Sequence, residues 1–470
     1  MYTTKEIEAL LDYGNLQNMS RIFTDLIKDH KERADKMRFM FDEYNGETEI
    51  RKRPIRTGDS SHKANNKLPN DYRGIIIDQA LAYVFGKSID ILIGKPYDEN
   101  EKVIKTLSDF KIENKIDDLD YETGFYAANC GYGTRLLYID ETGGIRVMNV
   151  KPWEAIIINS QTIEEPQYAM IYYLVDVFEA GNPDNKKSVY YVEWYDKENV
   201  YYYRENALNS GSYIVDPEAV KPSQKHGFDG IPVIKYKNNN IEKGDFEKVG
   251  DLIDAFDRVL SDSQNEIEDF RNAYMIFKGV MPDVATLVKA KETGAFGSDD
   301  KDFDISYLTK TINDTFVQNQ KKTLNENIYK FSKRVDMSDE NFSGSGQTGE
   351  SRKWKLLALE NDATIKEKKF RSANMEMYKL LCTAWDKSRK APRDMYLALS
   401  YQFTRNLPVD LVYYGDVLTK YWGKLPIETI YSLLPFIEDP EEETAFFEEE
   451  KQANIDQMFQ KVEEPENDED

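Results

Sequence analysis

The strongest constraint on the fold is a long stretch of helical periodicity in the second half of the chain. Between Val335 and Trp385, apolar residues recur three and four positions apart, and only Lys366 interrupts them. The stripe consists of Leu356, Leu359, Ala363, Phe370, Ala373, Met377, Leu380 and Ala384. This spacing predicts a helix of roughly nine turns at about 3.6 residues each. Few globular domains need so long a helix, so we expect a rigid rod that presents the segment at its base, and not an element of a buried core.

A turn-rich segment, Asp336 to Gly349, leads directly into this helix. Its end, Gly344-Ser-Gly-Gln-Thr-Gly349, has the letters of the dinucleotide pattern G-x-G-x-x-G. A dinucleotide site needs a preceding strand inside a βαβ unit, whereas a polar helical pattern precedes this segment. We therefore interpret the glycines as a source of loop mobility.

Charge and hydrophobicity narrow the classes of function. The net charge of -23 argues against tight, non-specific coating of nucleic acid, which needs a cationic surface, but allows a surface that DNA passes without sticking. No apolar run approaches the roughly 18 residues of a membrane span, and the first residues lack the features of a signal peptide. We expect no membrane partner and a chain that starts in the cytoplasm. Cys130 and Cys382 lie in apolar patterns and are predicted to be buried thiols.

The sequence contains no enzyme signature. Its three histidines, His30, His62 and His226, lack partners at metal-ligand spacing. The Gly86-Lys-Ser88 triplet resembles the end of a P-loop, but Leu81 stands where the first glycine is needed. We predict no catalytic residue, no cofactor and no metal site. Acidic clusters at 117–120 and 299–300 leave a metal-dependent nuclease as an alternative.

The first half of the chain is predicted to be one α+β domain, residues 1–240. A polar, basic segment at residues 46–70 interrupts its helices and is expected to be a long exposed loop, either a solvated arm or a contact with an acidic surface. The remaining elements are two helices within 4–43, helices at 71–86 and 117–129, and an antiparallel meander at 134–236 that opens with a hairpin around Glu141 to Gly144.

The second half is predicted to hold two long helices that enclose a small module. The first follows Asp245, a possible N-cap, and the second, at about 312–333, is mostly polar. A strand at 273–277 opens the module between them. After Trp385 we expect a strand at 395–403, short helices, an acidic helix at 440–462 and a disordered acidic tail.

Cations flank the turn-rich segment on both sides. Lys321, Lys322, Lys330, Lys333 and Arg334 precede it, and Arg352, Lys353 and Lys355 follow it. They are either ordinary solvated helix ends or a rim of mixed charge beside a phosphate backbone. Such a rim would attract DNA weakly and would not recognise its base sequence.

Several segments, in their order along the chain, resemble the phage portal proteins of the SPP1 type, the head-to-tail connectors. The resemblance covers roughly residues 60 to 455. It is carried by Asn66–Gly86, Gly244–Val249, Asn272–Gly279, Asp336–Gly344, Trp354–Glu360 and Phe403–Pro408. It implies a ring-forming α+β fold that is mainly helical, with long stem and crown helices and an antiparallel β-rich wing.

The same resemblance divides the chain into named parts. It implies a wing at 1–245, a first stem helix at 246–270, a clip at 271–311, a second stem helix at 312–334, a tunnel loop at 335–351, a long wing-to-crown helix at 352–387, a crown at 388–455 and a disordered acidic tail at 456–470.

The implied function is a DNA conduit without catalysis of its own. Such a ring, usually a dodecamer, stands at one capsid vertex of the virion after assembly in the host cytoplasm. The terminase packages double-stranded DNA through it, and the DNA later leaves by the same route. The implied partners are the terminase large subunit, a head-completion adaptor, and the major capsid and scaffolding proteins. A scaffolding or adaptor protein remains an alternative, as does the nuclease.

The resemblance also implies three sets of site residues. The tunnel loop comprises Asp336, Ser338, Asp339, Glu340, Asn341, Phe342, Ser343, Gly344, Ser345, Gly346, Gln347, Thr348 and Gly349. The channel-lining stem comprises Gln318, Lys321, Lys322, Asn325, Lys330, Lys333 and Arg334. The clip surface that contacts terminase or adaptor comprises Tyr274, Met275, Ile276, Phe277 and Lys278.

Overall fold

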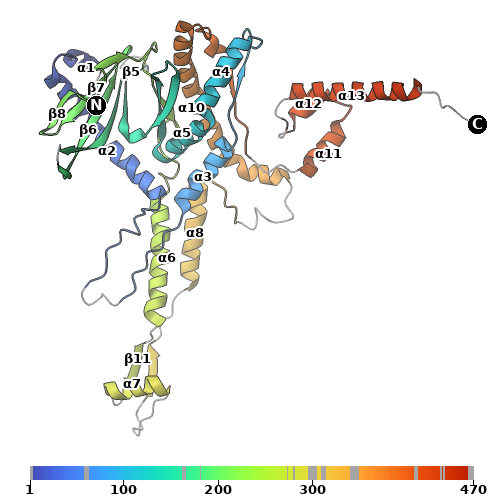
Figure 1. The fold of residues 1–470 in the computed structure, drawn as a ribbon. Coiled ribbons are helices and arrows are strands. Elements are labelled where there is room, and N and C mark those ends of the chain that lie inside the picture. Colours follow the sequence, from blue (N-terminus) through green and yellow to red (C-terminus); the bar gives the residue numbers. More distant parts are fainter. Residues whose placement is uncertain are drawn as a thin grey trace, which may run out of the picture. The chain divides into compact units, whose positions relative to one another are not determined.

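The structure is a computed structural model that describes residues 4–57, 63–160, 166–179, 182–271, 274–278, 281–294, 304–308, 314–338, 349–406, 411–434, 437 and 440–463. The chain divides into two compact units, Met1–Arg405 and Asn406–Asp470. Figure 1 shows the helices and antiparallel sheets of this α+β fold. No helix among the described residues has the length and apolar character that a membrane span requires.

The N-terminal helices cover a six-stranded antiparallel sheet. Helix α1 spans Thr4–Leu10 and α2 spans Leu16–Tyr44, with Asn15 as the N-cap of α2. The sheet has the order β4(Ala155–Asn159)-β5(Pro166–Glu179)-β6(Asn182–Tyr195)-β7(Asn199–Asn206)-β8(Asn209–Val215), and β9(Ser223–Lys225) also pairs with β7. Phe23 of α2 contacts the rings of Trp194 and Tyr203. Burial of such aromatic side chains holds the helix on the sheet.

A second sheet corrects the prediction of one continuous meander. Strands β2(Tyr132–Ile139) and β3(Ile145–Val150) form the predicted hairpin, with Ile139 opposite Ile145. However, β10(Val233–Lys237) returns to pair with β2, so these three strands form a sheet separate from β4–β8. Alternation of apolar residues identifies strands but does not specify their neighbours, which is why the sequence missed the division.

The long predicted helix exists as α10, Gly349–Lys387, but its C-terminal half is not a free rod. Phe370, Met377 and Tyr378 are at most 3% exposed, in a core cluster that also contains residues of β2, β3 and β10. The other walls of this cluster come from β1(Asp90–Ile93), α4(Glu101–Glu113), α5(Ile116–Cys130), the 3-10 turn η3(Met395–Ala398) and β13(Leu399–Gln402). The expected single stripe is joined there by Leu381, Cys382 and Trp385, which widen it into a broad buried face.

The two long helices predicted around the module exist, and they run side by side (Figure 1). Helix α6 spans Gly250–Arg271, α8 spans Asp314–Ser332, and Ile253, Phe256 and Ile328 are buried in one cluster with α3(Tyr72–Phe85). The predicted module between them contains the antiparallel pair β11(Tyr274–Lys278) and β12(Asp304–Leu308), and α7(Val284–Thr293). Asp245 is not the N-cap of α6, because that helix begins five residues later.

The second unit is helical. It contains α11(Leu411–Tyr421), α12(Ile427–Ser432) and α13(Pro440–Glu463), and the last confirms the predicted acidic helix. Trp422 and Phe447 meet edge to face with ring centroids 5.7 Å apart, which fixes α13 on the end of α11. In the first unit Cys130 and Cys382 are buried free thiols, as predicted, and burial raises the pKa of both to about 12.

Candidate functional site

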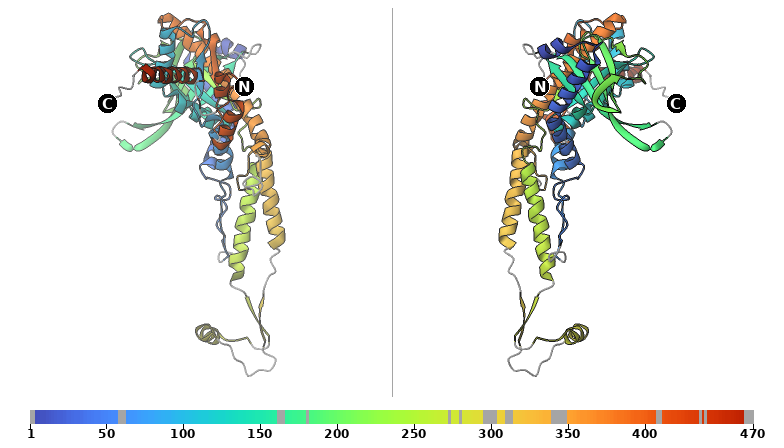
Figure 2. Two further views of the ribbon diagram at one scale, coloured as in Figure 1. Left: turned by 90° about the vertical axis from the view of Figure 1, so that its right-hand side faces the viewer. Right: turned by 90° about the vertical axis from the view of Figure 1, so that its left-hand side faces the viewer.

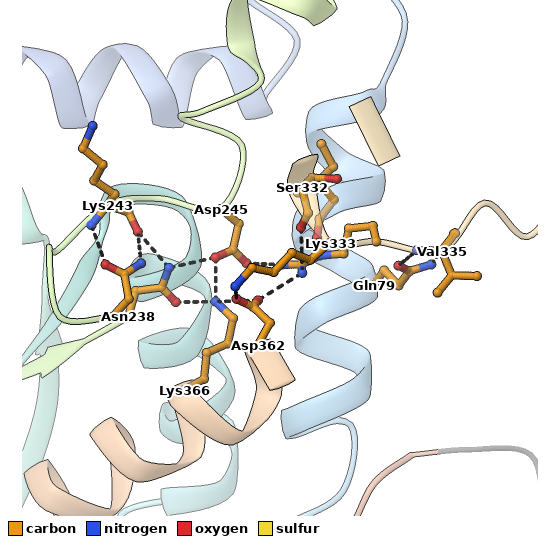
Figure 3. Close-up of polar contacts among 12 residues, drawn as sticks. Gln79, Asn238, Lys243, Asp245, Ser332, Lys333, Val335, Asp362 and Lys366 are labelled. Atoms are coloured by element: carbon orange, nitrogen blue, oxygen red, sulfur yellow. Dashed lines mark hydrogen bonds and ion pairs between the residues drawn. The ribbon is translucent and has the colours of Figure 1, made fainter. Parts of the chain in front are cut away.

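The turn-rich segment leaves α8 beside a largely buried group of polar and charged residues, two of which come from α10. We call this group the loop junction and define it as Asn238, Asp245, Arg334, Asp362 and Lys366. Figure 3 shows Asn238, Asp245, Asp362 and Lys366 converging from separate parts of the first unit. Arg334 joins them through ion pairs with Asp245 and Asp362. The sequence placed only Arg334 among the candidate site residues.

The end of α8 directs Arg334 into the junction. Lys333 has φ +60°, the left-handed conformation that ends a helix. The backbone N–H of Arg334 then donates to the carbonyl of Tyr329 over 3.0 Å, and the N–H of Lys333 donates to the carbonyl of Lys330 over 3.4 Å. This pair of bonds is the Schellman motif. It reverses the chain direction, so that the side chain after Lys333 points inward.

The Arg334 guanidinium, 0% exposed, is held on three sides. Its Nη2 lies 2.5 Å from Asp245 Oδ2, and its Nη1 lies 3.0 Å from Asp362 Oδ2. Its Nε donates to the carbonyl of Ile76 in α3 over 2.7 Å. A guanidinium keeps its charge in proteins, so its burial is tolerated only with such partners.

Lys366 completes the junction from α10. Its Nζ lies 2.6 Å from Asp245 Oδ1 and also donates to Asn238 Oδ1. Asn238 Nδ2 in turn donates to Asp245 Oδ1 over 2.7 Å. Burial alone would raise the pKa of Asp245, but Lys366 and Arg334 together lower it below the ordinary value. The junction therefore joins α8, α10 and the segment before α6 through one ionised carboxylate.

The first residues beyond α8 are also fixed. The side-chain amide of Gln79 donates to the carbonyl of Val335 over 2.9 Å and accepts from its N–H over 2.8 Å (Figure 3). Asp336 accepts from Asn325 Nδ2 at 3.0 Å and from the Ser338 hydroxyl at 2.6 Å. Burial would raise the pKa of Asp336, but these hydrogen bonds lower it overall. The chain thus departs from α8 along a defined path.

Of the predicted tunnel-loop residues, only Asp336, Ser338 and Gly349 lie within the described part of the chain. Gly349 is the first residue of α10. The remaining predicted residues, Asp339, Glu340, Asn341, Phe342, Ser343, Gly344, Ser345, Gly346, Gln347 and Thr348, lie outside it.

The predicted channel-lining residues occupy different surroundings. Gln318, Lys322 and Lys330 are exposed on α8, and Lys321 is half-buried. Asn325 accepts a hydrogen bond from Tyr72 over 2.6 Å, and Lys333 pairs with Asp362 at 3.3 Å. Arg334 has to be removed from this set, because a fully buried guanidinium cannot line a channel.

The predicted clip residues, Tyr274 to Lys278, form β11, and each lies opposite a residue of β12. Lys278 pairs with Asp304 at 3.3 Å. Met281, Val284 and Val288 follow, with exposed fractions of 80%, 77% and 54%. Three large apolar side chains gathered on so small a module are typical of a contact surface.

The acidic clusters are divided between the surface and the core. Asp117 and Asp118 are exposed in the first turn of α5, where negative charge suits the helix dipole. Asp120 is buried and pairs with Arg135 at 2.8 Å. Residues 299–300 lie outside the described ranges, and within those ranges no three His, Cys, Asp or Glu side chains are grouped to hold a metal ion.

Sequence reasoning missed Asn238, Asp245, Asp362 and Lys366 as parts of one site. One signal was available: Lys366 interrupts an otherwise apolar stripe, and a lysine at a buried helical position requires an anionic partner. The partner could not be identified from the sequence, because Asp245 lies 121 residues away.

Comparison with known proteins agrees with the resemblance noted in the sequence. The family model described as phage portal protein, SPP1 Gp6-like, matches residues 24–457. The portal protein of Clostridium phage phiCD119 is 25% identical over 408 residues, which cover 83% of this chain and 85% of the relative. The portal protein of Bacillus phage SPP1 is 23% identical over 410 residues, which cover 83% and 76%.

Among solved structures, a chain of the neck of an empty GTA particle computed with C6 symmetry is 11% identical, with a TM-score of 0.42. That match covers 77% of this chain and 90% of the other. The family model, in contrast, extends over nearly the whole sequence. This chain therefore belongs to the SPP1 Gp6-like family of phage portal proteins.

Proposed function

We propose that this portal-family chain forms a closed ring, most simply a dodecamer, at one vertex of a phage capsid, and that double-stranded DNA passes through its centre. The observation that carries the proposal is the arrangement around the turn-rich segment. The paired helices α6 and α8 lead to it, and the loop junction joins its start, at the end of α8, to Asp362 and Lys366 in the body of α10. A segment held on a rigid base suits a ring of loops around a moving polymer.

The surface of α8 suits a water-filled channel. Gln318, Lys322 and Lys330 are exposed on α8, which is mostly polar. Its apolar residues form a single stripe, so only one side of the helix needs to pack against another element. Each phosphate that a cation neutralises adds affinity through counterion release and therefore adds drag. A few lysines in a chain of net charge -23 would guide DNA without holding it.

The module between α6 and α8 is the proposed docking site for the packaging motor and, later, for the head-completion adaptor. Its support is the exposed apolar group Met281, Val284 and Val288 beside β11. The terminase large subunit would bind there during packaging and would supply the ATP hydrolysis. The major capsid and scaffolding proteins are the proposed partners during assembly in the host cytoplasm, and the ring stays in the virion.

Deletion of residues 339–348 tests the role of the loop. Because the deletion retains Val335, Asp336 and the loop junction, rings should form with normal mass, whereas DNA packaging or retention should fall. The matched control reverses an exposed charge elsewhere on the first unit, K197E, and should leave packaging unchanged. Loss of rings on deletion would place the segment in the subunit interface and contradict the proposed role.

Two other functions have a direct assay. A nuclease would cleave DNA in the presence of Mg²⁺ or Mn²⁺, and D117N/D118N would abolish cleavage. A scaffolding or adaptor protein would drive shell assembly without remaining as a ring in the finished particle. We expect purified protein to show neither behaviour.

A further inference from the structure

The basic segment at 46–70 is not a solvated arm, because its second half is bound along α6. The backbone N–H groups of Ala64, Asn66, Leu68 and Asn70 donate to side chains of Asp269, Asn265, Ser261 and Asp257, over 2.9, 2.6, 3.0 and 2.9 Å respectively. Every second residue of the segment thus meets every fourth residue of α6. We call residues 51–57 and 63–70 the strap.

The regular pairing has a geometric cause. Two residues of extended chain advance about 6.6 to 6.8 Å. Four residues of α-helix rise about 6 Å, and the ridge through them is inclined by about 26° to the helix axis, so that its step is about 6.7 Å. The two repeats match, so the pairing continues over all four hydrogen bonds without a shift of register.

The strap covers a buried polar stripe on α6. Asp257 and Ser261 are 0% exposed and Asn265 is 3% exposed, although each is polar. The two arms of the strap are tied together, because Lys67 Nζ donates to the carbonyl of Arg51 over 2.9 Å and Asn65 Nδ2 donates to that of Pro54 over 3.1 Å.

The outer side of the strap carries charge and one apolar residue. Arg53 does not belong to this outer side, because it pairs with Asp262 of α6 at 2.8 Å. Within the described part of the chain, Arg51, Arg56 and Lys63 form no ion pair, and Ile55 is 80% exposed. Arginine is enriched in protein interfaces, and Ile55 adds an exposed apolar side chain to this cationic surface.

The position of the strap indicates what it faces. In Figure 1 and in both views of Figure 2, the blue trace of the strap runs along α6 on the flank away from α8. The turn-rich segment begins at the end of α8, where Asp336 contacts Asn325 of that helix. If that segment faces a central channel, α8 is on the inner side of the ring and the strap lies on its outer side.

We propose that the outer side of the strap is a docking surface for an acidic protein surface that surrounds the stem helices, namely the opening of the capsid shell. The inference rests on the proposed ring. Arg51, Arg56 and Lys63 supply the charge complementarity, and Ile55 supplies the apolar anchor. The four hydrogen bonds to α6 already fix the strap, so that little conformational entropy is lost when the shell binds.

The test compares charge-reversed rings in shells assembled from the shell and scaffolding proteins of the same phage. The variant R51E/R56E/K63E changes side chains that form no ion pair within the described part of the chain, so it should form rings with normal mass and unfolding temperature. We expect the number of portal rings per shell to fall about ten-fold, because charge complementarity steers and orients association. I55D, which removes the anchor, should have the same effect.

The matched control is K197E/K221E/K225E, which makes the same charge change at exposed positions outside the strap. It should enter shells like the unaltered chain. Normal incorporation of R51E/R56E/K63E would overturn the docking inference and leave the ring intact. Loss of rings in that variant would also overturn it, because the strap would then lie between copies of this chain. If the unaltered chain forms no ring, the proposed function itself fails.

Discussion

Replacement of Lys366 by methionine is the sharpest test of the loop junction. Lys366 is 7% exposed and Asp245 is 4% exposed, so their 2.6 Å contact is shielded from water. Removal of one partner from a buried ion pair costs about 3 to 5 kcal/mol, because the other charge stays buried. Asp245 keeps Arg334 and Asn238 as partners, so we expect K366M to lower the free energy of unfolding by about 3 kcal/mol.

The matched control is K333M. Lys333 is 46% exposed and reaches Asp362 at 3.3 Å, so its loss should cost less than about 1 kcal/mol. The double variant D245N/K366M should be less destabilised than the sum of the single variants by about 2 kcal/mol, because both changes remove the same contact. Denaturant unfolding followed by fluorescence of the buried Trp153, Trp194 and Trp385 compares the unaltered chain with K366M, K333M, D245N and D245N/K366M at one protein concentration.

The pH dependence follows from the lowered pKa of Asp245. A carboxylate with a lowered pKa contributes stability that is present above its ordinary value of 3.8 and is lost as the pH falls through the lowered one. The cost of K366M should therefore be constant from about pH 5 to 8. If K366M costs no more than K333M, the junction does not hold the segment and the reasoning is refuted.

Three further predictions follow from local geometry. Within residues 64–68, the backbone amides of the even-numbered residues donate to side chains of α6, so they should exchange hydrogen at least about ten-fold more slowly than the odd-numbered amides. Equal exchange rates would show that these hydrogen bonds to α6 do not form. G131A should destabilise by more than about 2 kcal/mol, because its Cβ would lie 2.1 Å from the carbonyl oxygen of Glu242, whereas G143A, also at positive φ but in open space, should cost about 1 kcal/mol. Burial raises the pKa of Glu43 to about 7, so its contribution to stability declines as the pH rises from 4.5 to 7, and E43Q should flatten the unfolding temperature across that window.

Periodicity predicted the elements of this chain better than their surroundings. The apolar stripes identified α6, α8 and α10, because a repeat of three and four residues identifies a face of a helix. The same stripes could not say what covers that face. The C-terminal half of α10 is enclosed by the second sheet, and β1 pairs with β13 across some 300 residues of sequence. Such pairings depend on the whole fold.

The residues missed at the loop junction were missed for a related reason. A buried ion pair places opposite charges at positions that local rules assign to solvent or to a helix cap, as with Asp245. The strap shows the same limit of local reasoning. Its lysines and arginines give it the composition of an exposed loop, and composition cannot reveal that its backbone N–H groups bond to side chains of α6.

The most direct test of the account is the native mass of the purified chain, together with images of the same fraction in negative stain. The account predicts one closed species of about twelve copies with a central hole. A chain that remains monomeric or dimeric at every concentration, even when the shell and scaffolding proteins are present, would contradict it.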